Sequence, residues 1–186
     1  MQNISFQGRT NLVFSNIRYD QLNERTTTAR RKCSNGINQF LTKRTFGVDM
    51  EDCPLVVFVR GDNEGVIQRF TPGKKTSDLL FELEEKINQL KKDAQEKMTA
   101  WILGGKAQDE RTTRTVNEIA DLICDRPDID ASILTGDKIN TTERILVRGN
   151  SQGTEIIFPE LRGIKDSSDV ENVFEIVELN NTQVLF

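Results

Sequence analysis

Two short loops of this chain contain the residue types from which a site for a small anionic ligand can be built. The first loop begins with the sequence GGK and the second with TGDK. Glycines let the backbone come close to a ligand, and the lysine adds positive charge. Asp137 in the second loop is the carboxylate best placed to act as a general base or a metal ligand. The candidate ligand-binding residues are Gly104, Gly105, Lys106, Arg111, Thr135, Gly136 and Asp137.

The elements that must position these loops are two apolar strands and the helix between them. The strands are TAWIL (Thr99–Leu103) and ASIL (Ala131–Leu134), and the apolar spacing between them predicts a helix from about Glu110 to Asp125. A βαβ unit at 99–135 follows, with parallel strands and a right-handed crossover. Ligands of open α/β sheets bind beyond the carboxyl ends of such strands, where the helix N-terminus favours an anion.

The motif itself is weakly specific. The GGK sequence matches neither G-x-G-x-x-G nor G-x-x-x-x-G-K-[ST], and two glycines in a turn are usually only a turn. The pair Gly136-Asp137 also consists of residue types that are common in turns. The loops are therefore ranked as candidates and not identified as a site.

The chain contains no histidine among its 186 residues. This excludes Ser-His-Asp and Cys-His nucleophile pairs, and it excludes metal centres with histidine ligands. No complete catalytic motif remains. We therefore assign no catalytic residue, predict no metal and no cofactor, and favour a protein that is not an enzyme.

The remaining elements were inferred from apolar periodicity. Residues 17–44 carry apolar side chains at spacings of three and four, which predicts a basic helix after a strand at Asn11–Phe14. Residues 46–54 are expected to form a connector. A second amphipathic stripe predicts a helix from Thr76 to Met98.

Two hairpins and a late strand complete the predicted elements. The first hairpin joins Leu55–Arg60, which is apolar throughout and therefore central, to Val66–Phe70, which alternates and is expected to be half-exposed. The second joins Arg144–Arg148 to Thr154–Phe158. Strand candidates at 173–179 and 183–186 follow.

These elements predict an α/β (mixed α+β) fold. We expect one layered domain over residues 1–186, with a mixed sheet of about six to eight strands covered by about three helices. There is no convincing internal repeat and no long linker. A basic segment, 1–46, would pack on an acidic body, 47–186.

The charge is segregated along the chain. Residues 1–46 carry eight Lys/Arg and two Asp/Glu, a balance of +6, whereas residues 47–186 carry seventeen and twenty-seven, a balance of −10. Such asymmetry can indicate a nucleic-acid arm. Because no aromatic residues are interleaved for base stacking, nucleic acid is disfavoured, and the candidate protein-partner surfaces are the basic helix 17–44 and the acidic region 155–178.

The three cysteines and the hydropathy of the chain bear on the cellular compartment in which the protein is expected. Cys33, Cys53 and Cys124 are odd in number and widely spaced, which indicates neither a disulfide framework nor a zinc site. The start of the chain lacks the pattern of a secretory signal, and no apolar run approaches the roughly 20 residues that span a bilayer. A cytoplasmic location without a membrane span is the expectation.

One stretch carries a family likeness. From Ile102 to Phe158 the order is GG, helix, strand, acidic turn and hairpin, which weakly resembles the C-terminal half of the chemoreceptor glutamine deamidases. The resemblance covers under a third of the chain and implies a shared scaffold. That family's chemistry needs a Cys-His pair, so the resemblance does not imply its activity here. The opening ISFQGRTNLVF also looks like the start of some bacterial proteins, which implies no function.

Two functional hypotheses follow from the sequence. The first is a cytosolic, non-catalytic binding or protein-interaction domain. The second is a protein or enzyme for a small anionic or phosphorylated ligand, which would use the loops that begin at Gly104 and Thr135. Convergence of Lys106 and Asp137 on one pocket would favour the second hypothesis.

Overall fold

The computed structural model describes residues 2–5, 10–15, 36–39, 45–50, 53–60, 64–71, 73–91, 98–104, 110–135, 142, 144–150, 153–159 and 175–179. Within these residues the helices are α2 (Thr76–Lys91) and α3 (Glu110–Cys124). The strands are β1 (Gln2–Ser5), β2 (Thr10–Phe14), β3 (Gly36–Gln39), β4 (Thr45–Asp49), β5 (Leu55–Val59), β6 (Glu64–Arg69), β7 (Met98–Leu103), β8 (Ile129–Thr135), β9 (Arg144–Asn150), β10 (Gly153–Phe158) and β11 (Glu175–Glu178).

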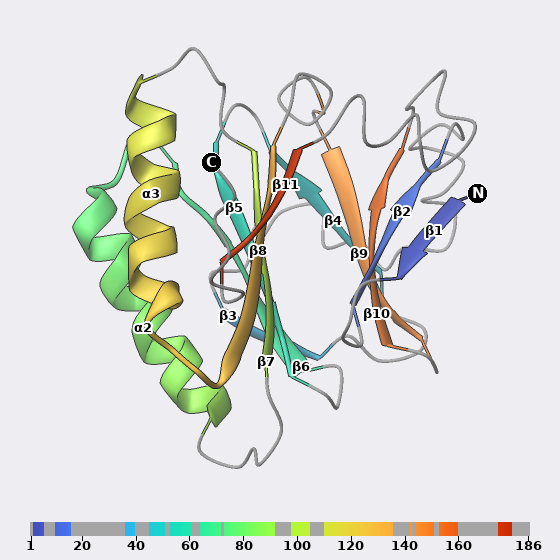
Figure 1. The fold of residues 1–186 in the computed structure, drawn as a ribbon, viewed down its shortest axis with the longest axis horizontal. Coiled ribbons are helices and arrows are strands. Elements are labelled where there is room, and N and C mark those ends of the chain that lie inside the picture. The colour runs from blue at the N-terminus through green and yellow to red at the C-terminus, as the bar shows by residue number, and fades with distance from the viewer. Residues whose placement is uncertain are drawn as a thin grey trace.

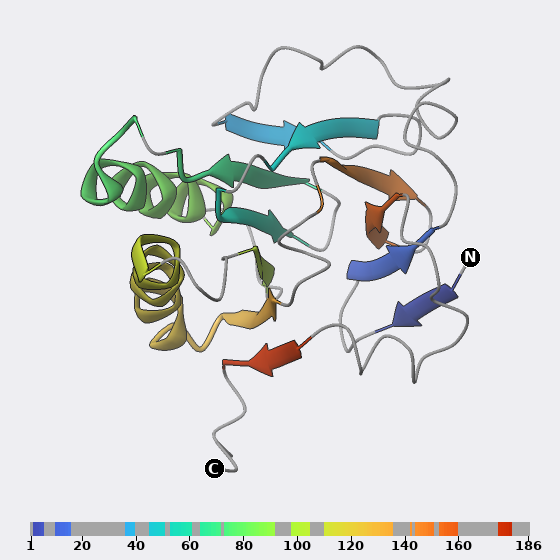
Figure 2. The ribbon, with the colours of Figure 1, turned by 90° about the horizontal axis from the view of Figure 1, so that it is seen from above.

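The described strands form two sheets. Sheet A has the order β1-β2-β10-β9-β4, and sheet B has the order β11-β8-β7-β5-β6-β3. Helices α2 and α3 cover one face of sheet B, and sheet A covers the other, so the fold has three layers (Figures 1 and 2). The mixed α+β class is confirmed. The single sheet and the three helices are corrected to two sheets and, among the described residues, two helices.

The βαβ unit and both hairpins were predicted correctly. Strands β7 and β8 are parallel, with Met98 opposite Ile129 and Leu103 opposite Leu134. Strands β5 and β6 form an antiparallel pair, as do β9 and β10. The second hairpin, however, belongs to sheet A and not to the sheet of the βαβ unit. Strands β8 and β9, which are consecutive in the sequence, therefore lie in different sheets.

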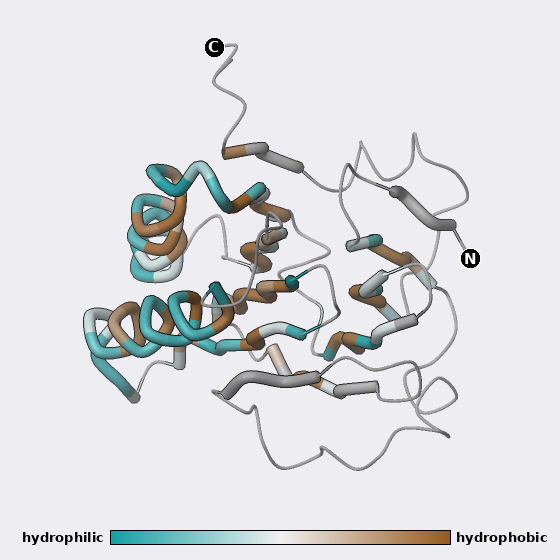
Figure 3. Tube along the Cα trace, turned by 90° about the horizontal axis from the view of Figure 1, so that it is seen from below, coloured by the Kyte–Doolittle hydropathy of each residue, from teal (hydrophilic) through white to brown (hydrophobic). Residues whose placement is uncertain are grey.

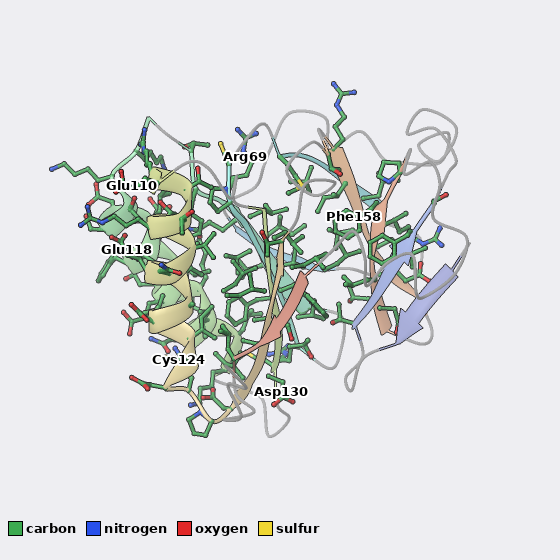
Figure 4. All side chains as sticks on the ribbon, turned by 45° about the horizontal axis from the view of Figure 1, so that its top comes forward. Arg69, Glu110, Glu118, Cys124, Asp130 and Phe158 are labelled. Atoms are coloured by element: carbon green, nitrogen blue, oxygen red, sulfur yellow. The ribbon has the colours of Figure 1, made fainter. Side chains whose placement is uncertain are left out.

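The two sheets enclose an apolar core. Trp101 of β7 is fully buried there, and Phe14 and Phe158 from sheet A stack with ring centroids 5.4 Å apart. Side chains from both sheets fill the space between them, with Phe158 on the sheet A side (Figure 4). Alternation along β5, for example, places Leu55, Val57 and Val59 in this core.

A second core lies between sheet B and the helices. Leu79, Leu83, Ile87 and Leu90 of α2 recur at helical spacing and are all buried. Hydrophobic residues of both helices gather on the sides that face the strands (Figure 3). Each such side chain contributes about 1.5–3 kcal/mol when fully buried, so tertiary packing holds these helices in place.

Several predicted boundaries are wrong. Residues 36–39, expected inside the first helix, form strand β3, which pairs with β6. Residues 45–49, expected mainly as a connector, form β4 of sheet A. Met98, expected in a helix, begins β7, while residues 17–35, 92–97 and 183–186 lie outside the described residues.

Strand β6 is also more buried than its alternating sequence predicts. Its residues from Gly65 to Gln68 are all buried, because α2 packs on one face and the core between the sheets lies on the other. Gln68 is the polar residue that misled the prediction. No helix within the described ranges is long and apolar enough to cross a bilayer.

Candidate functional site

The sheet brings the starts of the two predicted ligand loops together. Because β7 and β8 are parallel neighbours, their carboxyl ends meet at one edge of sheet B. The backbone N–H of Gly104 donates a hydrogen bond to the carbonyl oxygen of Leu134 at 3.2 Å. Gly104 and Thr135 therefore leave the sheet side by side.

Only part of the predicted ligand site is described. Gly105, Lys106, Gly136 and Asp137 lie outside the described residues, so the convergence of Lys106 with Asp137 stays a prediction. Arg111 is exposed in the first turn of α3, which starts at the same end of the sheet. Figure 4 shows this end of the molecule, marked by Glu110, with Asp130 at the opposite end.

Atoms of Met50 and Cys53 pack closely beside Gly104. Its φ is +88°, and a Cβ there would meet Met50 Cε at 3.3 Å and the Cys53 carbonyl oxygen at 3.6 Å. Both of those neighbouring residues are buried. The glycine is therefore explained by backbone conformation and close packing, and it need not bind a ligand.

The described residues contain no group of three or more His, Cys, Asp or Glu that could hold a metal ion. Cys124 is exposed at the end of α3, and its pKa is raised, first by desolvation and then by the carboxylates of Asp125 and Asp121. A raised pKa keeps the side chain a thiol and lowers its nucleophilicity near neutral pH.

The outer face of α2 is the more distinctive surface. Phe81 has 61% of its surface exposed and is the one large hydrophobic residue that is exposed among the described residues. Residues one helical turn away, Asp78, Glu84 and Glu85, are exposed as well. An aromatic ring therefore projects from an acidic helix face.

Helix α2 is fixed to the body by polar contacts as well as by its buried leucines. The side chain of Gln68 on β6 is buried, donates to the carbonyl oxygen of Leu79, and accepts a hydrogen bond from Lys86 Nζ at 3.0 Å. Arg60 donates to the carbonyl oxygen of Leu90 at 2.8 Å, in the last turn of the helix. Burial lowers the pKa of Lys86, although Glu82 acts in the opposite direction.

The last turn of α2 is also linked to the connection between α3 and β8. Lys91 Nζ lies 3.1 Å from Asp128 Oδ2, and Arg126 donates to Asn88 Oδ1 at 3.2 Å. These contacts hold the last turn of α2 against the body of the protein. Holding a surface in place lowers the entropic cost of binding a partner.

The sequence did not indicate this surface. Of the two partner surfaces that it proposed, the basic stretch contains strand β3 at 36–39. The acidic stretch begins with Glu155, which is buried and paired with Arg148 across β10 and β9. The signal in the sequence that could have indicated this surface is Phe81 itself. It lies outside the apolar stripe of the helix, where most of the other residues are charged.

Comparison with known proteins identifies no relative. No family model matches the chain, and no curated protein and no solved structure matches it. The resemblance to the glutamine deamidases gains no support from these comparisons. Function must therefore be argued from the chain's own geometry.

Proposed function

We propose that this protein is a non-catalytic binding domain that engages a protein partner through the outer face of α2. The observation that carries the proposal is the 61% exposure of Phe81 on a helix held by buried contacts along its opposite side. Aromatic residues are enriched among the side chains that dominate protein interfaces. A cytoplasmic location of the protein is part of the same proposal.

The proposal assigns Phe81 to binding and not to folding. Exposed side chains outside special backbone positions change stability by no more than about 0.5 kcal/mol when they are replaced. Phe81→Ser should therefore leave the fold intact while removing the centre of the contact. Gln89→Ser is the matched control, because Gln89 is exposed on the same helix.

The test is affinity capture with the two variants and the wild type, followed by measurement of the Kd with the purified captured protein. We expect a partner whose Kd rises at least tenfold with Phe81→Ser and stays unchanged with Gln89→Ser. A tenfold change corresponds to about 1.4 kcal/mol. A partner that binds all three proteins equally would show that α2 is not the contact surface.

A second function, binding of a small anionic or phosphorylated ligand, is favoured by one observation. The hydrogen bond from Gly104 to Leu134 brings the starts of the two loops together beside the N-terminal end of α3. Backbone N–H groups at a helix N-terminus favour an anion. In this proposal Lys106 and Arg111 supply charge, and Asp137 acts as a base or metal ligand.

A thermal-shift screen against nucleotides, sugar phosphates, simple anions and divalent metals tests the second function. Ligand at about 100 times its Kd should stabilise the protein by about 2.7 kcal/mol. We expect Lys106→Ala or Asp137→Ala to abolish the shift and Phe81→Ser to leave it unchanged. A shift insensitive to both loop variants would place the ligand elsewhere.

A further inference from the structure

Three of the four carboxylates nearest to Phe81 form no ion pair among the described residues. Glu82 lies 3.5 Å from Lys74 Nζ and 3.9 Å from Lys86 Nζ, so its charge is balanced. Within the described part of the chain, Glu84 and Glu85 form no ion pair, and Asp78 accepts only a 3.5 Å hydrogen bond from the Ser77 hydroxyl. The helix therefore places three carboxylates that form no ion pair with the described residues around an exposed ring.

The helical spacing places these groups on one surface. Asp78 precedes Phe81 by three residues, and Glu84 and Glu85 follow it by three and four. Residues three and four apart are neighbours on a helix surface, with about 5–6 Å between their Cβ atoms. A ligand that covers the ring must therefore also contact carboxylates.

We propose that the partner presents a cationic segment, an apolar side chain flanked by lysine or arginine, to this face of α2. The inference rests on the proposed function and adds the chemical class of the partner. The apolar side chain covers Phe81, and the cations approach Asp78, Glu84 and Glu85. Such complementarity speeds association and rejects partners of the same sign.

A second copy of this chain is a poorer occupant of the same surface. In a two-fold contact centred on Phe81, the same surface of both copies would meet, so that each copy would present the same residues to the other. Asp78, Glu84 and Glu85 would then oppose an identical acidic set. Like charges brought together across an interface are repulsive and act against association.

The test uses two labelled synthetic peptides that form amphipathic helices, one of leucine and lysine and one of leucine and glutamate. Their binding to the full chain is followed by fluorescence anisotropy at low and at raised salt. We expect the leucine–lysine peptide to bind, and its Kd to rise at least tenfold with Phe81→Ser and at least tenfold with the pair Glu84→Lys and Glu85→Lys. Raised salt should weaken binding to the wild type more than binding to the charge-reversed protein.

The control for net charge is the pair Asp121→Lys and Asp125→Lys, which changes two exposed carboxylates on and just after α3 by the same amount. This variant should keep the affinity of the wild type within about threefold, because solvent and salt screen exposed charges that are distant from the contact. Circular dichroism verifies that every variant is folded. An equal loss of affinity in the two charge-reversed proteins would overturn the proposal, because only total charge would then matter.

The remaining outcomes separate this proposal from the proposed function. If only the leucine–glutamate peptide binds, or neither peptide binds, the cationic class of partner is wrong, while the capture experiment still decides whether α2 is a contact surface. If the leucine–lysine peptide binds wild type and Phe81→Ser alike, the ring is not the centre of the contact. That result would overturn the inference and count against the proposed function together.

Discussion

At the scale of the residue, Gly104 shows how backbone conformation can explain a glycine in a loop without a ligand. It combines a φ of +88° with a close approach to Met50. An L-residue at such a φ costs about 1–2 kcal/mol. We therefore expect Gly104→Ala to lower the free energy of unfolding by about that amount, measured by urea denaturation.

Gly73→Ala is the matched control, since an added Cβ at Gly73 would meet no atom within 4 Å and its φ is not in the left-handed region. Its free energy of unfolding should stay within about 0.5 kcal/mol of the wild type. If the two variants were equally stable, the strain attributed to Gly104 would not exist.

Asp128 gives a prediction about pH. Burial raises the pKa of its carboxyl, but the hydrogen bond from Lys91 and the charge of Arg126 act against burial, and the net shift is downward from the usual value of 3.8. A carboxyl with a lowered folded-state pKa stabilises the protein above its unfolded-state pKa, and this contribution is lost as pH falls through the folded-state pKa.

The stability of the wild type should therefore fall below about pH 4, and Asp128→Asn should remove part of that dependence. The free energy of unfolding at several pH values between neutrality and pH 2 measures the effect. Asp121→Asn, which changes an exposed carboxylate on α3, is the control. If Asp128→Asn and wild type lost stability in parallel, the ion pairs with Lys91 and Arg126 would contribute nothing.

At the scale of the element, α2 depends on one buried polar residue. Gln68 joins β6 to the helix through the Leu79 carbonyl oxygen and Lys86 Nζ. Gln68→Ala would leave a cavity and remove the partner of two polar groups, at a cost of about 2–3 kcal/mol.

Urea denaturation of Gln68→Ala, with Gln89→Ala on the exposed side of α2 as the control, measures this cost. The control should differ from the wild type by no more than about 0.5 kcal/mol. A small effect of Gln68→Ala would mean that the other contacts of α2, such as its buried apolar residues and the hydrogen bond from Arg60, are sufficient to hold the helix.

The elements that were predicted correctly are those whose signals are local. The spacing of the apolar residues along the sequence predicts both the helix α2 and the strand–helix–strand order of the βαβ unit. Strand β3 was missed because Ile37 also fits a helical spacing, and its partner β6 is far along the chain. Strand β6 was expected to be half-exposed, because the hydrogen bonds of the buried Gln68 could not be seen in the sequence.

The candidate sites also differ in whether local sequence signals predict them. The meeting of Gly104 and Thr135 was predictable, because parallel strands end at a common edge. The surface around Phe81 was not predicted, because an exposed aromatic residue becomes informative only when the other faces of its helix are known to be filled.

At the scale of the whole molecule, pairing between distant segments decides the architecture. In sheet A, β2 pairs with β10 and β4 pairs with β9, and no local sequence pattern predicts these pairs. Strands β2, β9 and β10 were recognisable in the sequence, but the sheet to which they belong was not. This is why a single sheet was predicted where the structure has two.

The two cores share strands, which predicts cooperative unfolding. Trp101 is the only tryptophan and lies in the core between the sheets, whereas α2 and α3 pack on the opposite face of sheet B. Tryptophan fluorescence and the helical signal in circular dichroism should change at the same urea concentration. Two separate transitions would contradict the prediction that residues 1–186 form one domain.

The most direct test of the central proposal is to map the bound leucine–lysine peptide on the isotopically labelled protein by NMR. The proposal predicts that backbone amide shifts concentrate in α2 between Asp78 and Glu85, with the largest changes around Phe81. Shifts that concentrate instead at Gly104 and Thr135, or on sheet A, would contradict the assignment of α2 as the binding surface.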